Sequence, residues 1–523
     1  MSASREKKTR QDQASSGWVD PKTAREAKQR KEQKRSNLLY GTIFVVFLLV
    51  AAAAIVWKSN IIQRTATAVT IDGEKYTAAE VSYYYQNAYQ SFLNNMAAYG
   101  MTSYVGIDTS ASLRNQTVSS MGAMFSGAEE GSTWYDFFMD QALDSMADIQ
   151  ALEAAAEAEG FAWTDEMQAT LDANMEALTT GAASYGYTEA QYLSMIFGST
   201  MTKSIYEEQT KRAILVDAYQ SAYEDSLVYT DEELEEAYEA DTNTYDLVSA
   251  QYVYVSGSVP TTDDEGNEVE VTDEMKEEAM ATAKSYADQI YAGWQAGGDL
   301  ETLADECEGS ATYTDTDSAS YSASTLNEWL FDAARTAGDS AVLEDEVNSA
   351  YYVVVFESRG RNDYDTVDVR HILITPEESE LSSDDEGYEE DVAAKEAAAK
   401  EKADALLEEW KAGEATEDSF AQLAMDNSAD SSASVGGLYT EVYKGQMVTE
   451  FNDWCFDPSR QAGDTGVIET DYGAHVMYFV GYDIPYWKVQ VRDALRSEAV
   501  SQWYEEKTGE LTIEQGSGIQ YVG

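Results

Sequence analysis

The chain has 523 residues, of which 44% are hydrophobic, and a formal net charge of −62. At about 150 residues per domain, this length predicts about three or four units. The acidic surface argues against nucleic acid as a partner, because phosphate contacts need Lys and Arg. Two cysteines in so long a chain exclude a disulfide framework, although Cys307 and Cys455 could pair. We expect no metal and no cofactor, since no loop of spaced Asp and Asn residues of the calcium-binding type occurs.

The first feature along the chain is an apolar run at residues 38–57, LLYGTIFVVFLLVAAAAIVW, which contains no charged residue. As a helix, this run is long enough to cross a hydrocarbon core of about 30 Å, so it predicts a transmembrane signal anchor. Residues 1–37 hold 11 Lys or Arg against 5 Asp or Glu, which predicts a cytoplasmic basic tail with the rest of the chain outside the membrane. The alternative is a cleaved secretory signal with its small residues at Ala51 to Ala54, but the length of the basic and apolar segments favours the anchor.

Residues 58–247 are expected to form a mostly helical domain. They open with a predicted strand at Ala68–Ile71 and a turn at Asp72-Gly73. The long stretch that follows is rich in Ala, Tyr, Met and Glu, and it contains no enzyme motif and no repeat.

An internal repeat occupies the next part of the chain. Residues 327–339 read NEWLFDAARTAGD and residues 452–464 read NDWCFDPSRQAGD, and eight residues are identical at an offset of 125. Upstream of each copy, small and apolar residues recur at the spacing of one helix face. These residues are Ala283, Ala287, Ile290, Tyr291 and Trp294 in the first copy and Ala399, Ala403, Leu406, Leu407 and Trp410 in the second.

Each copy is also framed by two short apolar strands. The predicted strands are Gln251–Val255 and Tyr351–Phe356 in the first copy and Val369–Ile374 and His475–Val480 in the second. Two related α+β units are therefore predicted at 248–361 and 366–483. Residues 484–523 contain a predicted helix at Trp487–Lys507 and a Gly-rich tail, which could complete the helical domain. The predicted fold class is α+β, with a single N-terminal transmembrane helix, a mostly helical domain and two tandem α+β units.

The second unit carries five motifs in the order in which parvulins have them. They are VRHILI at 369–374, FAQLAMDNSAD at 420–430, VGGL at 435–438, KGQMVTEF at 444–451 and TDYGAHV at 470–476. The unit resembles a parvulin-type peptidyl-prolyl cis-trans isomerase. In its layout, the chain as a whole is similar to the PrsA-like and SurA-like extracytoplasmic foldases, and the helical region would then be a chaperone domain.

The resemblance implies the residues of an active site. His371 and His475 take the positions of the paired histidines, and Asp430 takes a position held by Cys or Asp in the family. A lone histidine in a strand is usually structural, but these are the only two histidines in the chain and both fall on motif positions. The resemblance further implies substrate-binding residues in a proline pocket and on the loop before the second histidine, namely Leu438, Met447, Phe451, Thr470 and Tyr472.

The chain departs from the family pattern in three places. Where parvulins commonly have Gly-Gly-Asp-Leu-Gly, this chain has Gly436-Gly437-Leu438-Tyr439, so the turn beside the pocket is expected to differ. The segment 376–391 holds nine acidic residues and no Lys or Arg, which argues against a phosphorylated substrate. The first unit has Tyr252 in place of His371, and Tyr351 or Tyr352 in place of His475, so we expect a parvulin-like module without catalytic histidines.

Rotation about an X-Pro bond meets a barrier of about 18–20 kcal/mol, because the planar amide is stabilised by resonance. A catalyst therefore needs an apolar slot for the proline ring and polar groups that favour the twisted amide. We expect a prolyl isomerase and chaperone that assists newly exported, unfolded polypeptides containing X-Pro bonds at the outer face of the cytoplasmic membrane. The alternative is a membrane-anchored holdase that uses its parvulin-like modules for binding only. An acidic adhesive protein would explain the charge but not the repeat.

Overall fold

The computed structural model describes residues 42, 44–48, 61–262, 270–307, 310–509 and 511–523. The chain divides into two compact units, Met1–Ser226 with Val500–Gly523, and Leu227–Ala499. Among the described residues, no helix has both the length and the hydropathy that a membrane span requires. Of the predicted anchor at 38–57, all but residues 42 and 44–48 lie outside the described residues.

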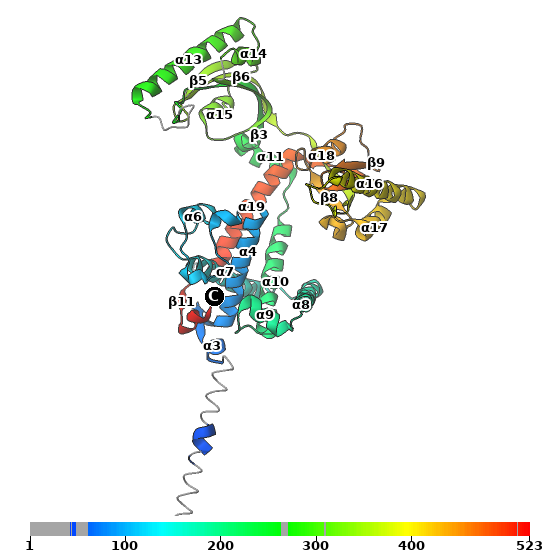
Figure 1. The fold of residues 1–523 in the computed structure, drawn as a ribbon. Helices are drawn as coiled ribbons and strands as arrows, with labels where there is room; N and C mark the ends of the chain where they lie inside the picture. Colours follow the sequence, from blue (N-terminus) through cyan, green and yellow to red (C-terminus); the bar gives the residue numbers. More distant parts are fainter. Residues whose placement is uncertain (1–41, 43, 49–60, 263–269, 308–309, 510) are drawn as a thin grey trace, which may run out of the picture. The chain divides into compact units, whose positions relative to one another are not determined.

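The first unit is mostly helical, as its composition predicts (Figure 1). Its strands are β1 (Thr67–Ile71), β2 (Glu74–Thr77) and β11 (Ile513–Gln515). Its helices are α3 (Ile61–Thr65), α4 (Ala78–Ala98), α5 (Thr102–Val105), α6 (Ser120–Ser126), α7 (Trp134–Glu159), α8 (Asp165–Ser184), α9 (Glu189–Phe197), α10 (Lys203–Ser226) and the end of α19 (Tyr486–Thr508), with short 3₁₀ turns at Leu113–Asn115 and Ser517–Tyr521.

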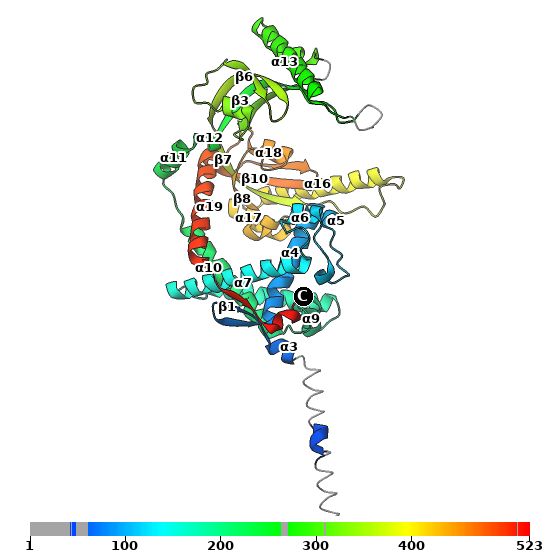
Figure 2. The ribbon, with the colours of Figure 1, turned by 90° about the vertical axis from the view of Figure 1, so that its left-hand side faces the viewer.

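The small sheet of the first unit has the strand order β11-β1-β2. The predicted strand and turn are confirmed: Asp72 and Gly73 both have positive φ angles, 44° and 88°, as a tight hairpin turn requires. The C-terminal segment joins the same sheet, because β11 pairs antiparallel to β1 with Val69 opposite Gln515 (Figure 2). The strands β1 and β11, which are far apart in the sequence, thus belong to one structural unit.

Helix starts in the first unit follow from the sequence. Thr residues precede several helices, and their hydroxyls accept hydrogen bonds from the backbone N–H three residues later, in some cases with a Glu or Gln side chain returning the bond. Such boxes are Thr77 with Glu80 and Thr188 with Gln191. The helices then bury an aromatic core in which the rings of Trp134 and Phe138 lie stacked at 5.9 Å.

The second unit holds two four-stranded antiparallel sheets. The first sheet has the strand order β4-β3-β6-β5 and consists of β3 (Asp246–Ser256), β4 (Ala311–Ser320), β5 (Ser340–Asp345) and β6 (Ala350–Arg361). The helices of this part of the chain are α11 (Asp231–Ala240), α12 (Thr242–Tyr245), α13 (Asp273–Gln295), α14 (Leu300–Asp305) and α15 (Thr325–Leu330). The second sheet has the strand order β8-β7-β10-β9 and consists of β7 (Asp365–Ile374), β8 (Leu438–Val442), β9 (Thr465–Thr470) and β10 (Gly473–Pro485). The helices of this part are α16 (Tyr388–Ala412), α17 (Glu417–Asn427) and α18 (Thr449–Cys455), with a 3₁₀ turn at Ser431–Val435.

The two sheets correspond strand by strand. His371 of β7 pairs with Met477 of β10, and Tyr252 of β3 pairs with Val354 of β6. His475 and Tyr352 each lie two residues before these partners. Tyr252 therefore takes the place of His371, and the register selects Tyr352, not its neighbour, as the residue in the place of His475. The rings of these two tyrosines meet edge to face at 6.0 Å.

Alternation along the strands gives the second sheet two distinct faces. Ile372 and Ile374 of β7, together with Val476 of β10, pack in a core with α16 and α17. Val369 of β7 and Met477 of β10 pack in another core with α18. Since His371 and His475 follow the odd-numbered pattern, both histidines face α18.

Both cysteines are buried, and they form no disulfide with each other. Cys455, the last residue of α18, aligns with the buried Leu330 in the repeat, and it is completely buried in the core that α18 forms with the sheet. Burial raises the pKa of its thiol to about 12, so it stays protonated and packs as an apolar side chain.

Candidate active site

The two histidines lie side by side on the central strands of the second sheet. His371 is 3% exposed and His475 is 5% exposed. Their Nδ1 atoms are 3.1 Å apart and their rings lie 5.3 Å apart at 18°. The two histidines are 104 residues apart in the chain, and the pairing of β7 with β10 brings them together.

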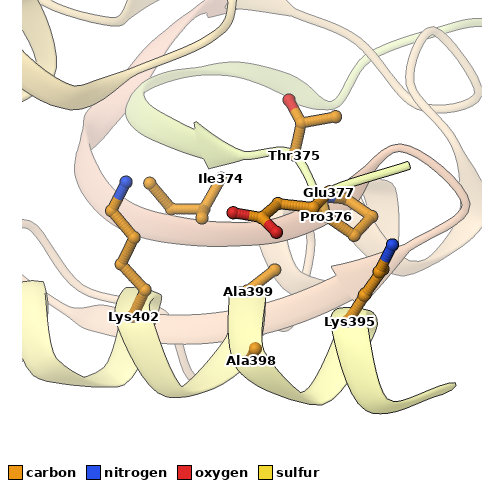
Figure 3. A pocket seen from close by; sticks show the side chains of 8 residues that line it. All are labelled: Ile374, Thr375, Pro376, Glu377, Lys395, Ala398, Ala399 and Lys402. Carbon is orange, nitrogen blue, oxygen red and sulfur yellow. The ribbon is translucent and has the colours of Figure 1, made fainter. Parts of the chain in front are cut away.

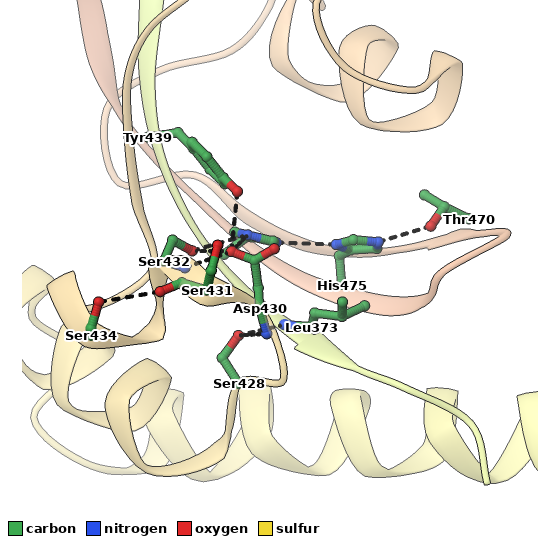
Figure 4. A network of polar contacts seen from close by, with 10 residues as sticks. Leu373, Ser428, Asp430, Ser431, Ser432, Ser434, Tyr439, Thr470 and His475 are labelled. Carbon is green, nitrogen blue, oxygen red and sulfur yellow. Dashed lines mark hydrogen bonds and ion pairs between the residues drawn. The ribbon is translucent and has the colours of Figure 1, made fainter. Parts of the chain in front are cut away.

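Asp430 lies next to His371 and organises one end of the network (Figure 4). Its Oδ1 atom lies 3.3 Å from His371 Nε2. The same oxygen accepts hydrogen bonds from the backbone N–H of Ser432 at 2.8 Å, from the Ser432 hydroxyl, and from the Tyr439 hydroxyl at 3.1 Å. Asp430 also caps the 3₁₀ turn that begins at Ser431, which fixes the carboxylate in position.

Thr470 closes the other end of the network. Its hydroxyl lies 2.8 Å from His475 Nε2, and its oxygen accepts a hydrogen bond from the backbone N–H of Tyr472 at 3.1 Å (Figure 4). An ionised carboxylate can only accept, so the Asp430 end requires the proton of His371 on Nε2, and the order of contacts then makes His475 Nε2 the acceptor of the Thr470 proton. His475 Nε2 is then the acceptor and His475 Nδ1 carries the proton.

The same direction from donor to acceptor holds for the contacts that follow, from His475 through His371 to Asp430. His475 Nδ1–H donates to His371 Nδ1, and the His371 Nε2–H faces two acceptors, Ser432 Oγ and Asp430 Oδ1, each 3.3 Å away. Each imidazole in this arrangement is neutral and has one donor and one acceptor nitrogen. The partners therefore assign one tautomer to each ring.

The ionisation states agree with this assignment. Burial lowers the pKa of His371, with Asp430 acting in the opposite direction. Burial lowers the pKa of His475 to about 4, and the neighbouring His371 adds to the effect. Burial alone would raise the pKa of Asp430, but the hydrogen bonds from the Ser432 side chain and backbone outweigh it, and the pKa falls to about 2. At neutral pH the site thus holds two neutral imidazoles beside one carboxylate.

We expect the imidazole of His475 to titrate with a midpoint near 4. A histidine in an unfolded chain has a pKa of about 6.5, so the unfolded chain takes up this proton first as the pH falls. The folded-state pKa is the lower one, and the stability that the neutral ring contributes is therefore present above about pH 6.5 and is lost between there and pH 4. NMR of ¹³C-labelled histidine measures this directly, because the chain has only two histidines. A midpoint at 6 or above for both rings would contradict the assignment.

An apolar cluster adjoins the histidines on the α18 face. The ring of Phe451 meets His371 edge-on at 5.4 Å and His475 at 5.8 Å. Met447 and Tyr439 are half-buried members of the same cluster. Of the other predicted substrate-binding residues, Leu438 is half-buried and pairs with Arg370, and Tyr472 is 63% exposed on the turn before β10. Phe451 and Thr470 thus contact the histidines, and Met447 packs in the cluster that contains Phe451.

Sequence reasoning missed Ser432 and Tyr439. Ser432 is 7% exposed and lies 3.3 Å from His371 Nε2, so it touches both His371 and Asp430. The Asp-x-Ser spacing at 430–432, which is typical of a side-chain-capped turn, was the available signal. Tyr439 follows Leu438 in β8 and pairs with Val369, which turns its side chain to the histidine face. Strand alternation would have found it.

A cavity of about 170 Å³ lies elsewhere in the same domain (Figure 3). It is bounded by Ile374 and the residues after it, and by Lys395, Ala399 and Lys402 of α16. Ile374 and Ala399 belong to the core on the α16 face of the sheet. This cavity is therefore separate from the histidine network, which faces α18.

Comparison with known proteins gives a match for this part of the chain. Residues 352–480 match the family model of the PPIC-type PPIase domain. The match begins in β6 and ends in β10, and it contains every residue of the histidine network. No curated protein matches the sequence.

Solved structures similar to this chain include PrsA and SurA-like proteins. PrsA from Bacillus subtilis is 15% identical, with 72% of this chain and 88% of that chain covered and a TM-score of 0.28. A structure described as one of two SurA-like chaperones of Campylobacter jejuni is 14% identical, with 69% and 90% covered and a TM-score of 0.18. PrsA from Bacillus anthracis is 20% identical with a TM-score of 0.18, and the matched part, 28% of this chain, spans only 58% of that protein.

TM-scores this low establish no shared overall arrangement, so the assignment rests on the family match and on the site geometry. The match confirms the resemblance to parvulins that the motifs indicated. The segment that carries His371, Asp430 and His475 is a PPIC-type, parvulin-type peptidyl-prolyl isomerase domain.

Proposed function

We propose that the chain is a membrane-anchored foldase that isomerises X-Pro bonds in newly exported polypeptides and holds them while they fold. The observation that carries the proposal is the paired, neutral, buried histidines next to an apolar cluster within the matched segment. In this proposal, His371, Asp430 and His475 are the catalytic residues. Phe451 and Met447 receive the proline ring.

The chemistry follows from the nature of the barrier. A planar amide is dipolar because its nitrogen shares electrons with the carbonyl oxygen, and this sharing is lost when the bond twists. Water stabilises the planar, more dipolar form. An apolar slot at Phe451 replaces that water, and the neutral imidazoles add no charge that would favour the planar form again. The fixed tautomers supply oriented dipoles without forming a bond to the substrate.

We further propose that the first sheet is a degenerate parvulin-like module. It has the same strand order as the second sheet, and Tyr252 and Tyr352 stand where the histidines stand. A phenol carries one hydroxyl and no ring nitrogen, so it cannot donate at one side of the ring and accept at the other, and the donor–acceptor chain of the isomerase domain has no counterpart there. The module would bind chains or orient the catalytic domain without isomerising.

The helical unit is the proposed chaperone domain. Three hollows of about 390, 360 and 300 Å³ lie along α4, α7 and α10, and all three share the side chain of Gln141. Aromatic and aliphatic side chains line them, among them Tyr83, Tyr84, Phe92, Phe137, Phe138, Ile149 and Leu152. Asp144 and Asp148 line the third hollow. This chemistry fits an unfolded stretch of polypeptide that carries aromatic or aliphatic side chains and basic residues.

Gln141→Trp should weaken the suppression of client aggregation by the full-length chain, because the indole would enter the space that all three hollows share. Gln90→Trp is the matched control, since Gln90 is also exposed, on α4, and lines none of these hollows. The measurement is light scattering of a denatured client at several salt concentrations, with basic and acidic clients compared. Equal suppression by both variants would remove the proposed client site.

The anchor at 38–57 is part of the proposal. Its support is the uncharged run of residues and the basic segment that precedes it. In cells stripped of their outer layers, added protease should degrade the chain beyond residue 57 without lysis. Degradation only after lysis would place the bulk of the chain inside and would contradict an extracytoplasmic role.

A protease-free isomerisation assay on the full-length chain tests the catalytic part of the proposal. We expect acceleration of cis-trans exchange in X-Pro peptides over the uncatalysed rate. No acceleration together with suppression of aggregation would favour the non-catalytic holdase. That alternative draws support from the first module, which has tyrosines at both histidine positions.

A further inference from the structure

Tyr439 makes a set of contacts that no other side chain of the site makes. Its hydroxyl donates to Asp430 Oδ1 at 3.1 Å. Its ring lies 5.3 Å from the ring of His371 at a tilt of 36°. The same ring belongs to the apolar cluster that contains Met447 and Phe451. One residue therefore touches the carboxylate and the histidine and packs in the apolar cluster.

The hydroxyl of Tyr439 competes with His371 for one oxygen atom. Asp430 Oδ1 accepts from the Ser432 N–H and from the Ser432 and Tyr439 hydroxyls, and it also lies 3.3 Å from His371 Nε2. An oxygen with two lone pairs cannot satisfy four donors equally well. Each hydrogen bond from another donor therefore weakens the pull of the carboxylate on the His371 proton.

Tyr439 is also suited to a permanent donor role. Burial raises the pKa of its phenol, and the negative charge of Asp430 raises it further, so the hydroxyl stays protonated across the physiological range. Asp430 stays ionised over the same range. The hydrogen bond between them is thus charge-assisted and does not switch with pH near neutrality.

We propose that Tyr439 is a positioning residue of the isomerase site: its hydroxyl sets how strongly Asp430 holds His371, and its ring forms one wall of the slot for the proline ring. The proposal rests on the isomerase activity of this domain. Because the histidine titration can be read without any substrate, failure of that activity and failure of the proposal give different results.

Tyr439→Phe isolates the hydroxyl, since the ring remains. Without the competing donor, Asp430 should pull more strongly on His371, and the imidazole pKa of His371 should rise by about half a pH unit or more. kcat should fall about tenfold with KM unchanged, an effect of the size expected for one charge-assisted hydrogen bond. Tyr439→Leu removes ring and hydroxyl together, and it should raise KM as well.

Tyr478→Phe is the matched control. Tyr478 is a half-buried tyrosine of the same sheet, on β10, but its ring packs with Trp410 and Phe420 on the opposite face. It should change neither the His371 titration nor kcat. If Tyr439→Phe behaves like this control in both measurements, the proposal is overturned.

A double-variant cycle gives a second, independent test. In Asp430→Asn the acceptor is neutral, so adding Tyr439→Phe should have little further effect on the His371 titration or on kcat. Additive effects of the two changes would show that Tyr439 acts without Asp430. That outcome would also overturn the proposal.

Discussion

The double variant His371→Ala, His475→Ala should isomerise X-Pro peptides at least about 100-fold more slowly than the natural chain, if each lost polar group matters as much as an oriented dipole in other active sites. The two rings lie 3.1 Å apart at their Nδ1 atoms and connect Asp430 to Thr470. Removing both rings takes away every oriented nitrogen of the network and admits water to the slot beside Phe451. The planar amide would then regain the stabilisation that the apolar site denies it.

The first module provides the matched control for this experiment. Tyr252→Ala, Tyr352→Ala makes the same kind of change at the corresponding positions of the related sheet. Isomerisation should stay at the natural rate, since those tyrosines have no role in the histidine network. Measurement of kcat/KM in a protease-free assay, with thermal unfolding followed alongside, separates lost chemistry from lost fold. An unchanged rate in a folded histidine double variant would remove the enzymatic function.

The two central strands of each sheet were predicted from the sequence, but the edge strands were not. The strands found from the sequence correspond to β3 and β6 of one sheet and β7 and β10 of the other. These central strands pack on both faces, so they are nearly continuous apolar runs. The edge strands include β4, which reads ATYTDTDSAS, and β9, which reads TGVIET. Their polar and Thr-rich sequences resemble loops, because an edge strand is half open to water.

The site was predictable in part for a related reason. The histidines stood out because the chain has only two, and a repeat allowed them to be compared with tyrosines. Ser432 and Tyr439 could not stand out in this way, since Ser and Tyr are common residues in the chain. Their roles depend on where the 3₁₀ turn directs Ser432 and on which face of β8 carries Tyr439. Composition encodes neither of them, and only the Asp-x-Ser spacing and the alternation along β8 point to these two residues.

Gly437→Ala should destabilise the isomerase domain by about 2–5 kcal/mol, as the sum of backbone strain and overpacking. Gly437 has a φ angle of +71°, which an L-residue adopts at a cost. A Cβ atom there would lie 2.2 Å from the carbonyl oxygen of His371 and 3.1 Å from Ala424 Cβ. Neither neighbour can move freely: one is backbone of a central strand, and the other is a fully buried side chain of α17.

The position also matters for the site, because the Gly437 carbonyl accepts a hydrogen bond from the His371 N–H at 2.9 Å. Any shift that relieves the clash would therefore move His371 relative to His475, so activity should fall together with stability. Urea unfolding followed by the two histidine NMR signals reports on this domain alone, since the chain has no other histidine.

Gly445→Ala separates the two contributions to that loss. Gly445 has a φ angle of +83°, but a Cβ atom there would meet nothing within 4 Å. Its substitution should cost only the backbone term, about 1–2 kcal/mol. The difference between the two variants is then the contact with His371 and Ala424. If both glycines cost the same, the turn at Gly436-Gly437 is not pressed against the histidine strand, and its close packing would have no part in positioning His371.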